Sequence, residues 1–145
     1  MTFPGLPDKD AVLAACRGFP NMTDHPMLDA AGELAILHST REHTPLSALK
    51  DVDRQRTRVM LGIDQWVVTT IPVPFPAARL STHTMGQVID QLAQLSVHTY
   101  IALAAAPEEL FYDASLRLAE AAGAYQNLVD ELACGLRRLP QHPTP

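Results

Sequence analysis

The segment LAEAAGAYQNLVDELACGLRRL, residues Leu118–Leu139, has the clearest periodicity in the chain and decides the fold class. Its apolar side chains recur at steps of four and three residues, which places them on one face of an α-helix. They are Leu118, Ala122, Tyr125, Val129, Leu132, Leu136 and Leu139. An apolar face of this kind, sustained over about three heptads, packs against other helices. The segment therefore predicts a long amphipathic helix in a helical domain.

This helix is expected to begin at Pro107, because a proline followed by Glu108 and Glu109 suits a first helical turn. An interruption is predicted near Tyr112, and Pro140 is expected to follow the last helical residue. The preceding helix is predicted from residues 81–84 to 105, because Thr84 and Gln87 have the spacing of a capping box. It is apolar on nearly every side, which is typical of a helix that is central in a bundle or covered by a partner.

Three further helices follow from prolines and capping residues. They span Asp8–Arg17, His25–Glu42 and Thr44–Thr70, and the prolines in 72–76 predict an extended crossing after the last of them. Short links between the long helices indicate antiparallel packing. We predict an all-α protein with an antiparallel four-helix bundle over residues 25–140. A short helix and linker occupy residues 1–24 in this prediction, and residues 141–145 form a frayed tail.

Composition and charge limit the possible partners. The chain has 145 residues, of which 47% are hydrophobic and 19% charged, so we expect one folded domain. Its formal net charge is −5 and it has no basic run, which argues against nucleic acid and anionic membranes as partners. The first residues do not resemble a signal peptide, and no apolar run reaches the ~18–20 residues of a membrane span. We therefore expect a cytoplasmic protein whose two cysteines are reduced.

Charged residues interrupt the apolar faces of two predicted helices. His38 and Glu42 are four residues apart on the inward face of the helix over residues 25–42, so they are neighbours there. Arg56 occupies an otherwise apolar row of the next helix, and Asp53 precedes it by three residues. The hairpin between the two helices is expected to bring these side chains to similar heights. The candidate cluster is His38, Glu42, Asp53, Arg56 and His98, with Glu120 as an outer member.

Two interpretations of this cluster remain open. In a pocket, Arg56 would offer a fixed fork for a carboxylate or phosphate, and the histidines could transfer a proton. In a structural lattice, the same charges would pair between helices, because buried charges need partners. The paired Glu-x-x-His motifs of helical di-metal proteins are absent, so we predict no metal and no other cofactor.

Asp90 is predicted to lie on the back of its helix, beside Val97 and Ile101, away from the main apolar face. At that position it could pair with an arginine of a neighbouring helix or with a second subunit.

A series of short motifs runs through the middle of the chain. They are Leu37-His38-x-x-Arg41, Val52-Asp53-x-x-Arg56 followed by Ile63-Asp64, and Thr82-x-Thr84-Met85-Gly86-x-Val88-Ile89-Asp90-x-Leu92. In this order and spacing they resemble a bacterial helical family, domain of unknown function 4254. The resemblance covers about half of the chain and implies an all-helical fold and a shared set of polar positions. These are His38, Arg41, Asp53, Arg56, Asp64 and Asp90. The acidic-acidic-Arg element that members often carry reads Thr40-Arg41-Glu42-His43 here, and the resemblance implies no activity.

Two functional hypotheses follow. The first is a non-enzymatic binding or assembly protein that forms a homodimer, because an apolar helix surface needs cover and two-fold dimers are the commonest assembly. The alternative is a small enzyme or ligand-binding domain that uses the His/Asp/Glu/Arg cluster on a small anionic molecule. The chain has no Gly-rich phosphate loop, nucleophile elbow or zinc motif, so we assign no catalytic residue.

Overall fold

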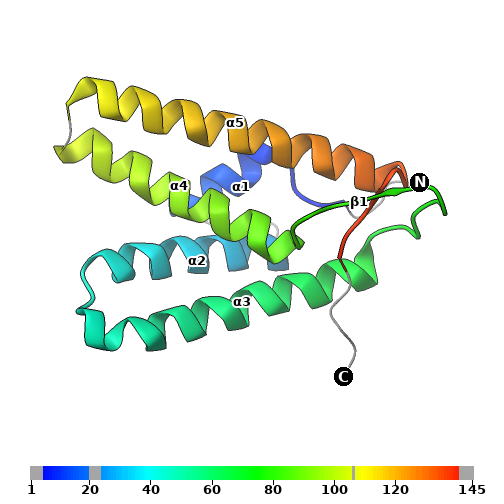
Figure 1. The fold of residues 1–145 in the computed structure, drawn as a ribbon, viewed down its shortest axis with the longest axis horizontal. Helices are drawn as coiled ribbons and strands as arrows, with labels where there is room; N and C mark the ends of the chain where they lie inside the picture. The colour runs from blue at the N-terminus through cyan, green and yellow to red at the C-terminus, as the bar shows by residue number, and fades with distance from the viewer. Residues whose placement is uncertain (1–4, 20–23, 106, 141–145) are drawn as a thin grey trace.

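The computed structural model describes residues 5–19, 24–105 and 107–140 (Figure 1). Its elements are α1 (Lys9–Cys16), α2 (Pro26–Glu42), the 3-10 turn η1 (Leu46–Ala48), α3 (Leu49–Thr70), β1 (Arg79–Leu80), α4 (Met85–Ala105), α5 (Glu108–Ala133) and β2 (Arg137–Arg138). Each strand has only two residues, so the prediction of an all-α protein is confirmed. The tail predicted over residues 141–145 and the linker segment 20–23 lie outside the described residues.

The four long helices form two hairpins, α2–α3 and α4–α5, and successive helices run in alternate directions (Figure 1). α4 is the central element, since it contacts α1, α2, α3 and α5. This position agrees with the apolar character of nearly all its sides.

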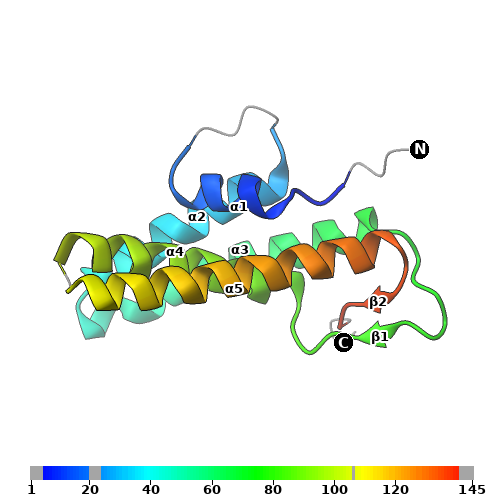
Figure 2. The same cartoon turned by 90° about the horizontal axis from the view of Figure 1, so that it is seen from above.

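α1 lies between α2 and α5 (Figures 1 and 2) and packs against both of them and against α4. Within the described residues, no Cα atom of α5 lies within 8 Å of a Cα atom of α2 or α3. α1 has 8 residues and is therefore about 12 Å long, whereas α2 has 17 residues. α1 therefore covers only part of the space between α2 and α5, and no helix covers the rest of it.

Local sequence signals set where the helices begin. The side chain of Asp8 accepts a hydrogen bond from the backbone N–H of Ala11, which caps α1. The predicted capping box of α4 is confirmed: Gln87 N donates to Thr84 Oγ1 at 3.2 Å, and Thr84 N donates to Gln87 Oε1 at 2.9 Å.

The end predicted for the last helix is wrong. α5 ends at Ala133 and not at Leu139, because Gly135 adopts a left-handed φ of 75° that turns the chain. The chain then forms β2, which pairs in parallel with β1. Leu136 is therefore exposed outside the helix, while Leu139 reaches the core from the segment after β2.

Two other helix details differ from the sequence prediction. α5 is continuous through Tyr112, where an interruption was expected. The helix expected from Thr44 begins with the η1 turn and becomes α-helical only at Leu49.

α3 and α4 approach each other closely at Gly86. A Cβ atom there would overlap the carbonyl oxygen of Met60 and lie 2.9 Å from Asp64 Oδ1. The backbone N–H of Gly86 donates to the same Asp64 oxygen at 2.6 Å. This contact holds the first turn of α4 against α3 and brings Asp90, one turn later, within reach of α3 side chains.

Candidate functional site

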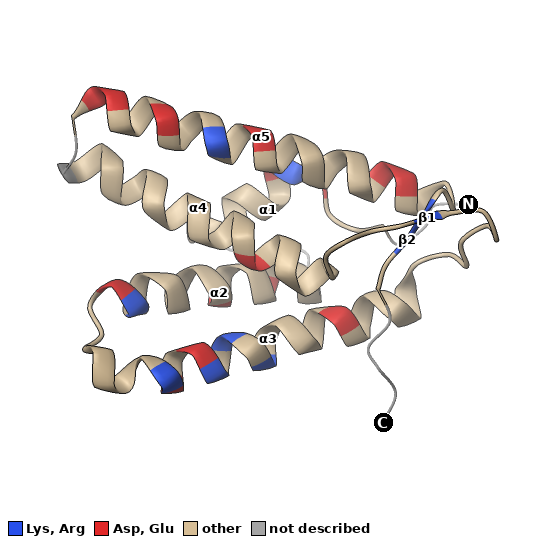
Figure 3. Ribbon diagram, viewed as in Figure 1, with Lys and Arg blue, Asp and Glu red and all other residues tan. Residues whose placement is uncertain are grey.

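A chain of ion pairs joins α2, α3 and α4 at Asp90, which is the only Asp, Glu, Lys or Arg in the sequence of α4 (Figure 3). His38 Nε2, on α2, lies 2.8 Å from Asp90 Oδ1. Arg56, on α3, donates from Nε to Oδ1 at 3.2 Å and from Nη2 to Oδ2 at 2.8 Å. The guanidinium therefore binds both oxygens of the carboxylate, the strongest arrangement for such a pair.

The chain of ion pairs continues outward through Asp53. Arg56 Nη1 donates to Asp53 Oδ1 at 2.8 Å, and Arg41 Nε, on α2, donates to the same oxygen at 3.0 Å. His38 and Asp90 are buried, whereas the Arg41–Asp53 end is open to solvent. We refer to His38, Arg41, Asp53, Arg56 and Asp90 as the charge network.

The charge network keeps its carboxylates ionised. Burial opposes ionisation of Asp90, but the hydrogen bonds from His38 and Arg56 outweigh it and hold the pKa of this carboxyl below its ordinary value. The hydrogen bond from Arg41, joined by that from Arg56, lowers the pKa of Asp53. The hydrogen bond to Asp90 raises the pKa of Arg56, so this side chain stays positively charged.

Each charge in the network has an opposite charge beside it. A ligand anion could reach Arg56 only by displacing Asp53 or Asp90. No network residue lines either of the two cavities described below. The geometry therefore favours the structural lattice over the ligand pocket.

The structure divides the cluster expected from the sequence. Three of its members, His38, Asp53 and Arg56, come together with Arg41 and Asp90, two positions that the family resemblance implied. Asp90 pairs with an arginine of a neighbouring helix, as one of its two predicted alternatives had it, and it does so at a buried contact with α2 and α3. Glu42 pairs with His98 at 3.4 Å in a separate, half-exposed contact and not with His38. Asp64 is at the Gly86 contact, and Glu120 lines a cavity on the other side of α4.

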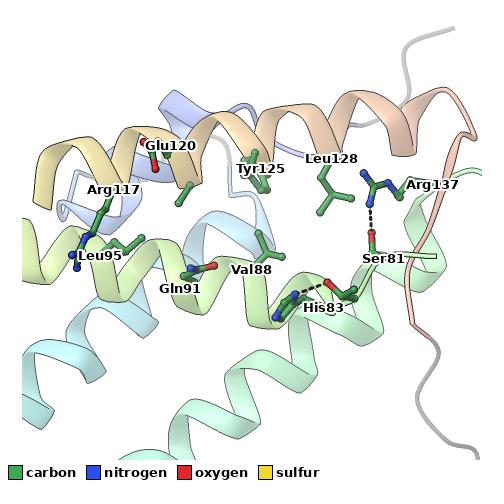
Figure 4. Close-up of a pocket in the computed structure, with 13 residues that line it drawn as sticks. Ser81, His83, Val88, Gln91, Leu95, Arg117, Glu120, Tyr125, Leu128 and Arg137 are labelled. Carbon is green, nitrogen blue, oxygen red and sulfur yellow. Dashed lines mark hydrogen bonds between the residues drawn. The ribbon is translucent and has the colours of Figure 1, made fainter. Parts of the chain in front are cut away.

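That cavity, which we call the polar pocket, has a volume of about 690 Å³ between α4 and α5 (Figure 4). Val88, Leu95 and Tyr125 contribute apolar lining. Polar side chains come from α4, α5 and the segments around β1 and β2: Ser81, His83, Gln91, Arg117, Glu120 and Arg137. Except for Glu120, sequence reasoning missed these residues, because they come from separate elements and share no spacing that would identify them.

The second cavity, which we call the apolar groove, occupies the uncovered space between α2 and α5 and has a volume of about 1260 Å³. The C-terminal half of α4 forms one side of it, with Val97, Tyr100, Ile101 and Leu103. Ile36 adds an apolar side chain from α2, and Phe19 adds one from the segment after α1. Asp29, Glu33 and Glu42 line the α2 side of the groove.

No set of His, Cys, Asp and Glu side chains within the described ranges could hold a metal ion. No helix in the same part of the chain is long and apolar enough to cross a membrane. No disulfide joins Cys16, which is buried, to Cys134, which is exposed.

The lowered pKa values of Asp90 and Asp53 make stability depend on pH. A carboxyl whose folded-state pKa is depressed stabilises the fold above its ordinary value of 3.8, and this stabilisation is lost as pH falls through the folded-state pKa. We expect urea unfolding to show a free energy that declines below about pH 4. Asp90→Asn should weaken this decline, whereas Asp51→Asn, at an exposed ion pair, should not. An unchanged pH dependence in Asp90→Asn would contradict the assignment.

No family model, curated protein or solved structure matches the chain. The resemblance to domain of unknown function 4254 therefore stays a prediction.

Proposed function

We propose that this protein is a non-enzymatic binding or assembly protein that forms a homodimer through the apolar groove. The exposed apolar back of α4 is the observation that carries the proposal. Tyr100 is 74% exposed and Leu103 is 63% exposed, beside Ile36 at 68%. A contiguous exposed apolar surface on a single chain is typical of an interaction site. Burying it would stabilise association by roughly 25 cal/mol per Å².

The architecture explains why this surface is open. We propose that the four long helices form an antiparallel bundle whose α2–α5 side is closed by α1 over part of its length only. The groove lies where a further helix would pack in a closed bundle. Side chains that such a helix would bury therefore remain in contact with water.

The charges around the groove also support binding of protein rather than of a small anion or nucleic acid. Asp29, Glu33 and Glu42 outnumber the single arginine of the groove, Arg17, so the groove as a whole would repel carboxylates and phosphates. The guanidinium of Arg56 is already engaged by two carboxylates of the charge network. The free thiols of Cys16 and Cys134 suit the reducing cytoplasm expected from the sequence.

We expect Ile36→Asp to weaken self-association at least tenfold, because the dimer would have to bury an unpaired carboxylate in an apolar contact. The measurement is the molar mass from light scattering over a dilution series. Val68→Asp is the matched control, since Val68 is a β-branched side chain of α3, 60% exposed and outside the groove. A wild-type chain that stays monomeric at high concentration would refute the proposal.

A small-ligand function is the second candidate, and the polar pocket favours it. Arg117 lies at one end of the pocket and Arg137 at the other (Figure 4), with apolar side chains between them. Its volume is in the range of about 300–1,000 Å³ that is typical of small-molecule sites. If this function holds, native mass spectrometry of the purified protein should show a bound molecule that Arg117→Met releases. A spectrum of unliganded chain alone would argue against it.

A further inference from the structure

We infer that the apolar groove of one copy binds the basic tip of a second copy, so that the association joins two different surfaces. The basic tip consists of Val73, Phe75, Arg79, Leu80, Leu136 and Arg138. This inference rests on the proposed self-association and adds which surfaces meet in it.

The basic tip is a second exposed apolar surface, formed by β1, β2 and the loop before β1. Phe75 N donates to Gly135 O at 2.9 Å, and Arg79 N donates to Leu136 O at 3.2 Å, so the two segments form one unit. Val73, Phe75, Leu80 and Leu136 are all exposed on it. Like the back of α4, it presents apolar side chains to water without a neighbour in the described chain to cover them.

The charges of the two surfaces are opposite. The side chain of Arg138 is exposed and donates to the carbonyl oxygen of Pro76, and no ion pair of Arg138 is present among the described residues. Arg79 lies 3.7 Å from Glu131 and is mostly exposed. The lining of the groove instead has three carboxylates, Asp29, Glu33 and Glu42, against one arginine, Arg17, so acidic side chains predominate there. Two grooves placed face to face would bring their acidic sides together, whereas a tip in a groove pairs unlike charges.

The positions of the two surfaces also differ. The basic tip lies at the end of the molecule where α5 ends, while the groove includes the C-terminal half of α4, toward the opposite end (Figure 2). A contact between unlike surfaces at opposite ends is heterologous: it closes into a dimer only if both contacts form at once, and otherwise it extends.

Mixing two defective variants tests this inference. Ile36→Asp disables the groove, and Leu80→Asp, at a tip residue that is 64% exposed, disables the tip. Each variant retains the surface that the other lacks. We therefore expect each variant alone to be monomeric, and the mixture to form a two-chain species with a Kd at least tenfold lower than either variant shows with itself. Each variant alone, at the total concentration of the mixture, is the control.

A charge exchange provides a second measurement that leaves the apolar side chains intact. Glu33→Lys and Arg138→Glu should each weaken association, and their mixture should recover it because the opposite charges again meet. Circular dichroism verifies that every variant is folded.

The outcomes separate this inference from the function on which it rests. If Ile36→Asp dissociates the protein but Leu80→Asp does not, or if neither mixture recovers association, the groove binds a different surface and the inference is overturned. A wild-type chain that is monomeric at all concentrations would overturn both the inference and the proposed function.

Discussion

Replacing Arg56 with methionine is expected to lower the free energy of unfolding by about 3 kcal/mol and the Tm by roughly 10 °C. Arg56 is the largest contributor of hydrogen bonds to the charge network, with one to Asp53 and two to Asp90. Methionine keeps the apolar stem but removes the guanidinium. Asp53 retains Arg41, but Asp90 keeps only His38 and becomes a buried, poorly compensated charge. Urea unfolding at neutral pH measures the loss.

Arg54→Met is the matched control. Arg54 is also on α3 and pairs with Asp51 at 3.5 Å, but its side chain is 66% exposed, so the change should stay within about 0.5 kcal/mol. Adding Asp90→Asn to Arg56→Met should recover part of the loss, because a neutral amide leaves no uncompensated charge. If Arg56→Met is as stable as the wild type, the structural account of the network is wrong and the ligand-pocket interpretation regains support.

Gly86→Ala is expected to destabilise the protein by about 3 kcal/mol, although alanine is the better helix former. The added Cβ would overlap the Met60 carbonyl oxygen of α3 and crowd Asp64 Oδ1. Backbone atoms cannot move aside as a flexible side chain can, so the two helices must separate. The hydrogen bond from Gly86 N to Asp64 would be weakened in the same movement. Thermal unfolding followed by circular dichroism measures the effect.

Gly62→Ala shows whether the cost comes from the close contact. Gly62 is also a helix glycine, but a Cβ there meets nothing within 4 Å. We therefore expect a gain of up to about 1 kcal/mol from helix propensity alone. Equal effects of the two substitutions would show that α3 and α4 are not held together at Gly86.

Most helix boundaries could be predicted from the sequence, because capping residues and prolines act locally. The boundary of α5 could not. The four-three spacing of apolar residues continues through Leu136 and Leu139, so the pattern hides the turn at Gly135. Leu139 is buried as predicted, but it lies in the segment after β2 and not in the helix. The same spacing of apolar residues therefore occurs in a helix and in the extended segment that follows it. The pairing of β1 with β2 depends on tertiary contact. Each strand has only two residues, which is too few to show the alternation of apolar and polar residues that identifies a strand in a sequence.

The charge network was predictable in part. Arg56 in an apolar row and Asp53 beside it showed that α3 carries charge toward the interior. The pairing of Asp90 with an arginine of a neighbouring helix was one of two predicted alternatives, but its place in the cluster was missed because a helical projection assumes one buried face, whereas α4 contacts helices on several sides. The groove could not be located from the sequence, since it exists only because α1 is too short to cover the space between α2 and α5. The apolar back of α4, which forms one side of it, was visible in the sequence.

Hydroxyl-radical footprinting tests most directly whether the groove is the binding surface of this protein. Tyr100, 74% exposed, lines the groove, whereas Tyr112, 67% exposed, lies outside it, so the two tyrosines form an internal comparison. Oxidation of each is measured by mass spectrometry in dilute and in concentrated protein. We expect oxidation of Tyr100 to fall on concentration while that of Tyr112 stays unchanged. Equal oxidation of Tyr100 at both concentrations, or equal protection of the two tyrosines, would contradict the account.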